Sequence, residues 1–139
     1  YIHATRRIGV LVEVNCETDF VARTLTFREL ARTIAMHIAA SQTEYIHLKD
    51  IPADVVERER VLESNRDDLA DKPAELREKI VCDRIEKRLK EMTLLEQPYI
   101  RDQTITVDEL IRLIMASLGE NIEVRRFARF SLGESKSSL

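Results

Sequence analysis

The sequence predicts an α+β domain in which an antiparallel sheet from the terminal strands is covered by helices, with a charged helical hairpin in the middle. Near each end of the chain apolar residues alternate with polar ones, whereas between the ends they recur every three or four residues. The first pattern is typical of half-buried strands and the second of amphipathic helices. The 139 residues are 44% hydrophobic and 34% charged, so one globular domain can bury a core without metals or disulfides.

The first strand is expected over residues 7–16. Its apolar positions share one parity and comprise Ile8, Val10, Val12, Val14 and Cys16. Because Cys16 falls on this parity, we expect a buried, unreactive thiol rather than a nucleophile. Residues 1–4 either continue this strand or pair with it. The only other cysteine is Cys82, and two cysteines suit a reducing compartment rather than a disulfide framework.

A turn and a helix follow the first strand. Residues 17–21 break the alternation, and Thr18 and Asp19 are of the types that cap helices and stabilise turns. The helix is expected over residues 26–40, with an apolar stripe of Phe27, Leu30, Ala31, Ile34 and Ile38. Met36 points to the opposite side of this helix, and His37 lies at the edge of the stripe.

Two charged helices are expected in the middle of the chain. Pro52 opens the first, which ends at about Arg66, and Pro73 opens the second, which reaches Met92 or Leu95. Both have narrow apolar seams, so they should form a helical hairpin. Such a hairpin could pack on the sheet, project from it or pair with another copy.

The last part of the chain should contain short extended stretches at 98–100 and 103–105, a helix over 107–118 and a final strand. Thr106 caps the helix in a capping box with Glu109, and Gly119 ends it. In the final strand one apolar parity, interrupted by Arg126, comprises Ile122, Val124, Ala128, Phe130 and Leu132. The domain should therefore span residues 1–133, followed by a flexible tail at 134–139.

The sequence argues against several kinds of chemistry. The three glycines stand alone, so no phosphate-binding loop is present, and the three histidines form no metal-binding motif. We therefore expect no enzyme, no catalytic residue, no metal, no cofactor and no membrane span. The net charge of -3 speaks against nucleic-acid binding, and a role in surface ion pairs is the more common one for Arg125, Arg126 and Arg129.

One feature has two interpretations. Phe20 lies beside Asp19 where the first strand gives way to the helix. A phenylalanine in such a turn most often packs under the start of the helix. Alternatively, it is a rigid aromatic side chain presented to a partner's pocket, as at an interface hot spot.

Four blocks of the sequence resemble the elongation factor Ts family, in the family's order and across nearly the whole chain. The first, residues 8–23 (IGVLVEVNCETDFVAR), is similar to the family's signature. The others are residues 35–40 (AMHIAA), 95–99 (LEQPY) and 119–127 (GENIEVRRF). A core and dimerisation domain is thereby implied, similar to short, single-core members such as the Thermus type. The family's N-terminal ubiquitin-associated-like module is missing, and the chain lacks an initial Met, so a fragment or processed product is expected.

The resemblance implies a guanine-nucleotide exchange factor for the GTPase elongation factor Tu, in the cytoplasm of a bacterium or in an organelle of bacterial origin. Phe20 would insert near the Mg²⁺ and nucleotide site of that partner, and the implied partner-binding residues are Thr18, Asp19, Phe20, Val21, Met36 and His37. Asn15 and Glu17 would shape the turn. Direct binding of nucleotide by this chain is not expected, whereas a homodimer is, with the charged hairpin and the sheet surface as candidate interfaces.

Other functions remain open at this point. The same fold could serve as a non-catalytic interaction, dimerisation or ribosome-associated module that has lost exchange activity. His37 is as easily a satisfied histidine at the helix edge as a partner contact. An RNA-binding domain that uses the three arginines, and an enzyme built on Cys16, are weaker alternatives.

Overall fold

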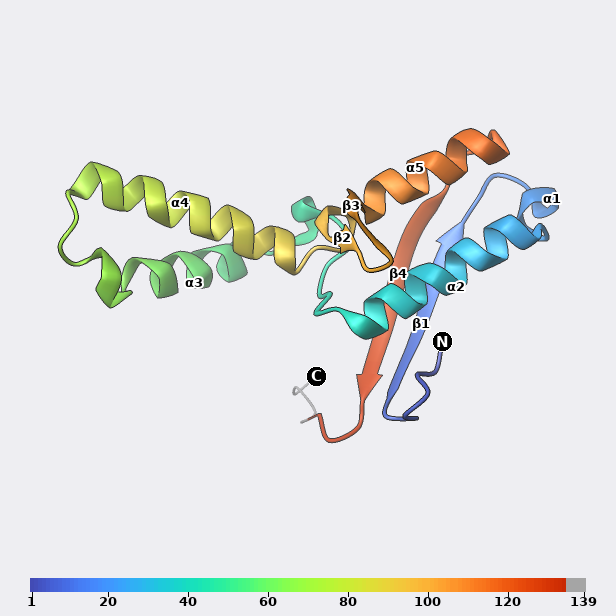
Figure 1. Ribbon diagram of the computed structural model, residues 1–139, viewed down its shortest axis with the longest axis horizontal. Helices are drawn as coiled ribbons and strands as arrows, with labels where there is room; N and C mark the ends of the chain where they lie inside the picture. Colours follow the sequence, from blue (N-terminus) through green and yellow to red (C-terminus); the bar gives the residue numbers. More distant parts are fainter. Residues whose placement is uncertain (135–139) are drawn as a thin grey trace. The chain divides into compact units, whose positions relative to one another are not determined.

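The computed structural model describes residues 1–134, which form two compact units (Figure 1). One unit combines Tyr1–Gln42 with the chain from Pro98 onward, and the other is Thr43–Gln97. The first unit contains β1 (Ile8–Asn15), α1 (Asp19–Ala22), α2 (Leu25–Ala40), β2 (Pro98–Tyr99), β3 (Asp102–Thr106), α5 (Val107–Leu118) and β4 (Glu123–Ser131). The second contains α3 (Ala53–Ser64) and α4 (Ala74–Glu91). Residues 135–139 of the expected tail lie outside the described part, and the single domain over 1–133 stays a prediction.

The expected α+β class is confirmed, because β1 and β4 pair as an antiparallel sheet that joins the two ends of the chain. The first residues pair with the other edge of β1 and do not continue it. Ile2 bridges Gly9, and the backbone N–H of Val10 donates to the carbonyl oxygen of Tyr1 at 2.8 Å. A tight turn in which Arg6 has a φ of 57° connects this segment to β1.

A β-bulge in β4 reverses the side-chain parity that the sequence predicts. Glu13 lies opposite Arg126 but Val14 lies opposite Val124, so Arg125 is an extra residue without a counterpart. An extra residue shifts every following side chain to the other face. The prediction that Phe130 and Leu132 share the buried face of Val124 is therefore wrong, since both are exposed.

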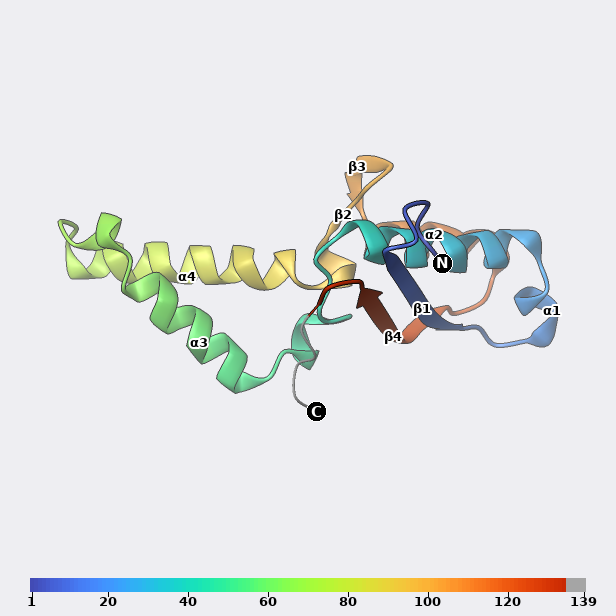
Figure 2. The same cartoon turned by 90° about the horizontal axis from the view of Figure 1, so that it is seen from below.

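Helices cover one face of the β1–β4 sheet (Figures 1 and 2). Helix α2 packs on β1, and α5 packs beside α2. Their apolar stripes point inward, as the three-to-four spacing predicts. The buried core of this unit includes Val10, Val21, Phe27, Leu30, Ile34, Ile38, Val107, Ile111, Ile122 and Val124.

The ends of α5 have the capping residues that the sequence predicts. The Thr106 hydroxyl accepts a hydrogen bond from the backbone N–H of Glu109 at 3.2 Å, which starts α5. Gly119 ends α5 with a φ of 71°, a conformation that glycine adopts without the steric cost a Cβ brings. The thiol of Cys16 is only half-buried, contrary to expectation, because β1 ends at Asn15 and the thiol turns to the carbonyl oxygen of Thr18.

The second unit is the expected charged hairpin. Helices α3 and α4 run side by side in opposite directions (Figure 1), and Leu69, in the connection, packs against Val81 and Ile85 of α4. Arg84 of α4 forms ion pairs with the exposed Asp68 and with the buried Glu63 of α3. The Arg84 guanidinium donates hydrogen bonds to Asp68 and lowers the pKa of that carboxyl below 3.8.

Candidate functional site

The most exposed large hydrophobic side chain of the described residues is Phe20, with 83% of its surface accessible. It lies on α1, the single helical turn between β1 and α2 (Figure 1). A phenylalanine that packed under the start of the helix would be mostly buried, so that interpretation is excluded. An aromatic ring held in water on an ordered turn has its apolar surface free for an intermolecular contact.

Capping threonines fix the turn that carries Phe20. The Thr18 hydroxyl accepts a hydrogen bond from the backbone N–H of Val21 at 3.3 Å and so caps α1. The Thr24 hydroxyl donates to the carbonyl oxygen of Val21 at 2.7 Å and accepts from the backbone N–H of Phe27 at 3.2 Å. The Val21 side chain, 5% exposed, packs in the core. The buried Val21 and the two threonines therefore anchor α1 to the core, while Phe20 points into solvent.

Two glutamates join this turn to the residues that follow α5. The Glu120 carboxylate accepts three hydrogen bonds, from the backbone N–H groups of Glu17 and Thr18 at 3.1 and 3.0 Å and from the Thr18 hydroxyl at 2.6 Å. In return, the Glu17 carboxylate accepts from the backbone N–H of Asn121 at 3.1 Å. Glu17 was expected to shape the turn, whereas Glu120 was not. The one feature of the sequence that could have indicated a role for Glu120 is its position directly after Gly119, the glycine that ends α5.

Met36 and His37 lie far along α2 from Phe20. They belong to the C-terminal half of α2, and Met36 is about 17 Å along the helix axis from Leu25, where α2 begins beside α1. His37 is 1% exposed, and its Nδ1 accepts from the backbone N–H of Ile100 at 3.4 Å. The half-buried Met36 contacts Arg101 through its sulfur at 3.3 Å. The structure thus does not bring these two residues together with the Phe20 turn.

The three arginines of β4 do not form one basic patch. Arg126 donates to the Glu13 carboxylate on β1 and lowers the pKa of that group below 4.5. Arg129 lies on the helix-facing side, where its guanidinium donates to the carbonyl oxygen of Ala39 at 3.2 Å. Arg125 is the bulged residue. Arg125 and Arg126 both act on the Glu13 carboxylate, whereas Arg129 lies apart from them on the helix-facing side.

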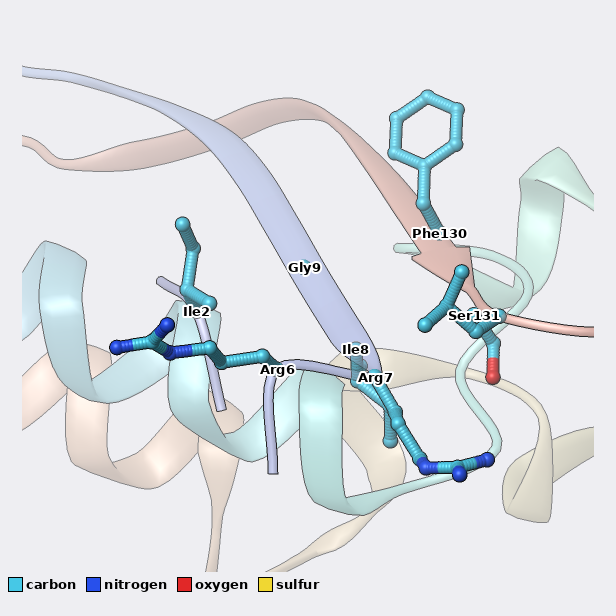
Figure 3. A pocket seen from close by; sticks show the side chains of 8 residues that line it. Ile2, Arg6, Arg7, Ile8, Gly9, Phe130 and Ser131 are labelled. Carbon is cyan, nitrogen blue, oxygen red and sulfur yellow. The ribbon is translucent and has the colours of Figure 1, made fainter. Parts of the chain in front are cut away.

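The face of the sheet that the helices leave uncovered is apolar. We call it the outer face. Its exposed large hydrophobic residues are Ile2, Leu11, Phe130 and Leu132, and the ion pair of Glu13 with Arg126 lies at one end of it. Phe130 lies opposite Gly9, which has no side chain to cover the ring, and Figure 3 shows the ring pointing away from the sheet. Leu11 and Phe130 are 75% and 70% exposed, which marks a second surface suited to contact.

Within residues 1–134, no three His, Cys, Asp or Glu side chains gather closely enough to hold a metal ion. No helix in this part of the chain is long and apolar enough to cross a membrane.

Comparison with known proteins agrees with the sequence blocks described above. The family model "Elongation factor TS" matches residues 1–134. Proteins named elongation factor Ts from Synechococcus elongatus, Microcystis aeruginosa and a Synechocystis species are 64%, 60% and 58% identical over 135 residues, or 96% of this chain. The chain spans 61%, 54% and 62% of the length of these relatives. Because the family model matches nearly the whole length of this chain, the chain belongs to the elongation factor Ts family.

Proposed function

We propose that this chain promotes release of GDP from the GTPase elongation factor Tu, with Phe20 as the main contact. The observation that carries the proposal is an aromatic side chain that is 83% exposed on a turn fixed by hydrogen bonds and by a buried Val21. Because the backbone of the turn is fixed before binding, less conformational entropy is lost on binding, and more of the burial of Phe20 contributes to affinity.

The proposed mechanism involves no covalent step. A GTPase holds GDP through phosphate contacts and a Mg²⁺ ion that is itself bound by oxygen atoms. A factor that binds the nucleotide-free GTPase better than the GDP-bound form weakens the hold on GDP by that difference in affinity. Since such coupling is reciprocal, a new nucleotide expels the factor, which is not consumed. We expect the ring of Phe20 to enter the partner near its Mg²⁺ site, as the family resemblance implies.

The residues of the turn have distinct roles in this proposal. Phe20 supplies the apolar contact, and Asp19, in the first turn of α1, places a carboxylate beside it. Thr18 holds the turn in place by capping α1, and Val21 does so by packing in the core of this chain. Asn15 closes β1 opposite Glu123 and sets where the turn begins.

Met36 and His37 would form a second, weaker contact in the same complex. The half-buried Met36 has surface available to a partner. The buried His37 would not contact the partner directly. It would position the backbone at Ile100, whose N–H donates to its ring.

We also propose that a second copy of the chain covers the outer face. The resemblance to short family members implies a homodimer, and the outer face offers Leu11 and Phe130, both at least 70% exposed. Burial of these side chains against a copy of themselves would remove a large apolar surface from water. The hairpin of α3 and α4 is the alternative interface.

A non-catalytic interaction or ribosome-associated module is the alternative function, since the chain spans only part of the length of its relatives. The deciding experiment measures release of fluorescent GDP from elongation factor Tu with and without the chain, and with Phe20→Ala. Acceleration that the variant lacks supports exchange through Phe20. If the folded wild-type chain produces no acceleration, the non-catalytic alternative holds.

A further inference from the structure

We propose that Glu120 is a positioning residue for exchange: it holds the Phe20 turn in its binding-competent conformation from the opposite end of the chain. The inference rests on the proposed function, because it assigns Glu120 a task in presenting Phe20. Glu120 follows Gly119, the residue that caps the C-terminal end of α5, and belongs to no helix or strand.

The first argument is the number and placement of the hydrogen bonds. One carboxylate accepts from two consecutive backbone N–H groups and from a hydroxyl, at 3.1, 3.0 and 2.6 Å. Hydrogen bonds to an ionised acceptor are about twice as strong as neutral ones. Two consecutive N–H groups aimed at one oxygen also fix the peptide plane between Glu17 and Thr18, just before α1.

The second argument is a continuous chain of contacts from Glu120 to Phe20. The Thr18 hydroxyl that donates to Glu120 also accepts from the backbone N–H of Val21, and this second bond caps α1. With its single proton committed to Glu120, the Thr18 oxygen presents its lone pairs to that N–H. Phe20 lies within the capped turn. Loss of the carboxylate therefore frees the cap as well as the preceding peptide.

The third argument is that α1 has little else to stabilise it. It is four residues long, and a single helical turn does not form by propensity alone. Only Val21 of its residues is buried. The turn depends on its caps and on the bonds to Glu120, so these decide how often Phe20 is presented correctly.

Loss of Glu120 should reduce the fraction of chains whose turn is ready to bind. The apparent affinity falls in proportion to that fraction, whereas the bound state is unchanged once formed. We expect Glu120→Ala to raise the concentration of chain that half-saturates GDP release roughly 10- to 100-fold. The rate of release at saturation should stay close to that of the wild type.

The conservative variants separate this role from the mere presence of a polar residue. Glu120→Gln keeps one oxygen for the two backbone N–H groups but loses the second acceptor for the Thr18 hydroxyl. Its half-saturation concentration should therefore fall between those of the wild type and Glu120→Ala. Glu120→Asp keeps the charge but is one methylene shorter, so it should resemble Glu120→Ala. Glu123→Ala, which removes an exposed carboxylate three residues further along, is the matched control and should behave as the wild type does.

The test is a titration of fluorescent-GDP release from elongation factor Tu with each variant, alone and combined with Phe20→Ala. Because Glu120 acts through Phe20, adding Glu120→Ala to Phe20→Ala should cause little further loss, a non-additive result. Thermal unfolding identifies variants that do not fold, in which case Glu120→Asp carries the test.

Each outcome decides one point. A raised half-saturation concentration with non-additivity supports the positioning role. Wild-type behaviour of Glu120→Ala, a fall in the saturating rate alone, or full additivity with Phe20→Ala overturns it and leaves the proposed function standing. If the wild-type chain itself fails to accelerate release, the proposed function falls, and the role of Glu120 falls with it.

Discussion

Replacement of Phe20 by alanine should separate binding from folding more cleanly than any other single change in this chain. The ring is 83% exposed, so its removal exposes little core and opens no internal cavity. Substitutions at such positions usually change the free energy of unfolding by no more than about 0.5 kcal/mol. We therefore expect Phe20→Ala to unfold at nearly the wild-type temperature.

The effect on binding follows from the same exposure. Because most of the ring is in water before binding, nearly its full transfer free energy, about 1.5–3 kcal/mol, is available to the complex. The empty pocket left in the partner adds to the loss, which brings the total to about 2–4 kcal/mol. At 1.4 kcal/mol per factor of ten, affinity should fall roughly 30- to 1000-fold.

The assay is stopped-flow release of fluorescent GDP from elongation factor Tu over a range of chain concentrations. Leu62→Ala is the matched control, because Leu62 is an apolar side chain, 58% exposed, on the separate hairpin unit. It should leave release unchanged. The reasoning would be refuted if Phe20→Ala released GDP as fast as the wild type does. It would also be refuted if Leu62→Ala lost as much activity, or if Phe20→Ala lost activity because it unfolds.

Three further predictions concern the rest of the chain. In the dimer proposed above, Phe130→Asp should lower the mass at sedimentation equilibrium from that of a dimer to that of a monomer, since it places a charge on the outer face; a wild-type dimer whose variant keeps the dimer mass would exclude that face as the interface. His37→Ala should lower the free energy of unfolding by about 2–4 kcal/mol, because it leaves a cavity and an unpaired N–H at Ile100; retained stability in denaturant titrations would contradict this. Asp68→Asn should destabilise the chain at neutral pH. Because Arg84 holds the folded-state pKa of Asp68 below 3.8, its ionised form stabilises the fold above that value, and the stabilisation is lost as the pH falls through the lower folded-state pKa. The difference in the free energy of unfolding between Asp68→Asn and the wild type should therefore shrink in acid. A difference that stays constant with pH would show that the Asp68–Arg84 ion pair does not cause it.

The sequence by itself determined the class of fold and most element boundaries, because those depend on local patterns. The apolar stripe of α2 and the caps of α5 at Thr106 and Gly119 involve residues only a few positions apart, and the structure has them where expected. The pairing of the terminal strands joins distant residues but could also be predicted, since two amphipathic strands have few other ways to bury their apolar faces.

Only the tertiary structure decided which face each residue of β4 occupies and how Phe20 is placed. The bulge at Arg125 depends on the register against β1, and it moves Phe130 from the expected core to the outer face. The bonds between Glu120 and Thr18 join residues 102 positions apart, and no local pattern encodes such a pair. The sequence left both interpretations of Phe20 open, because its direction depends on where the whole fold places the turn, and in the structure the ring is exposed.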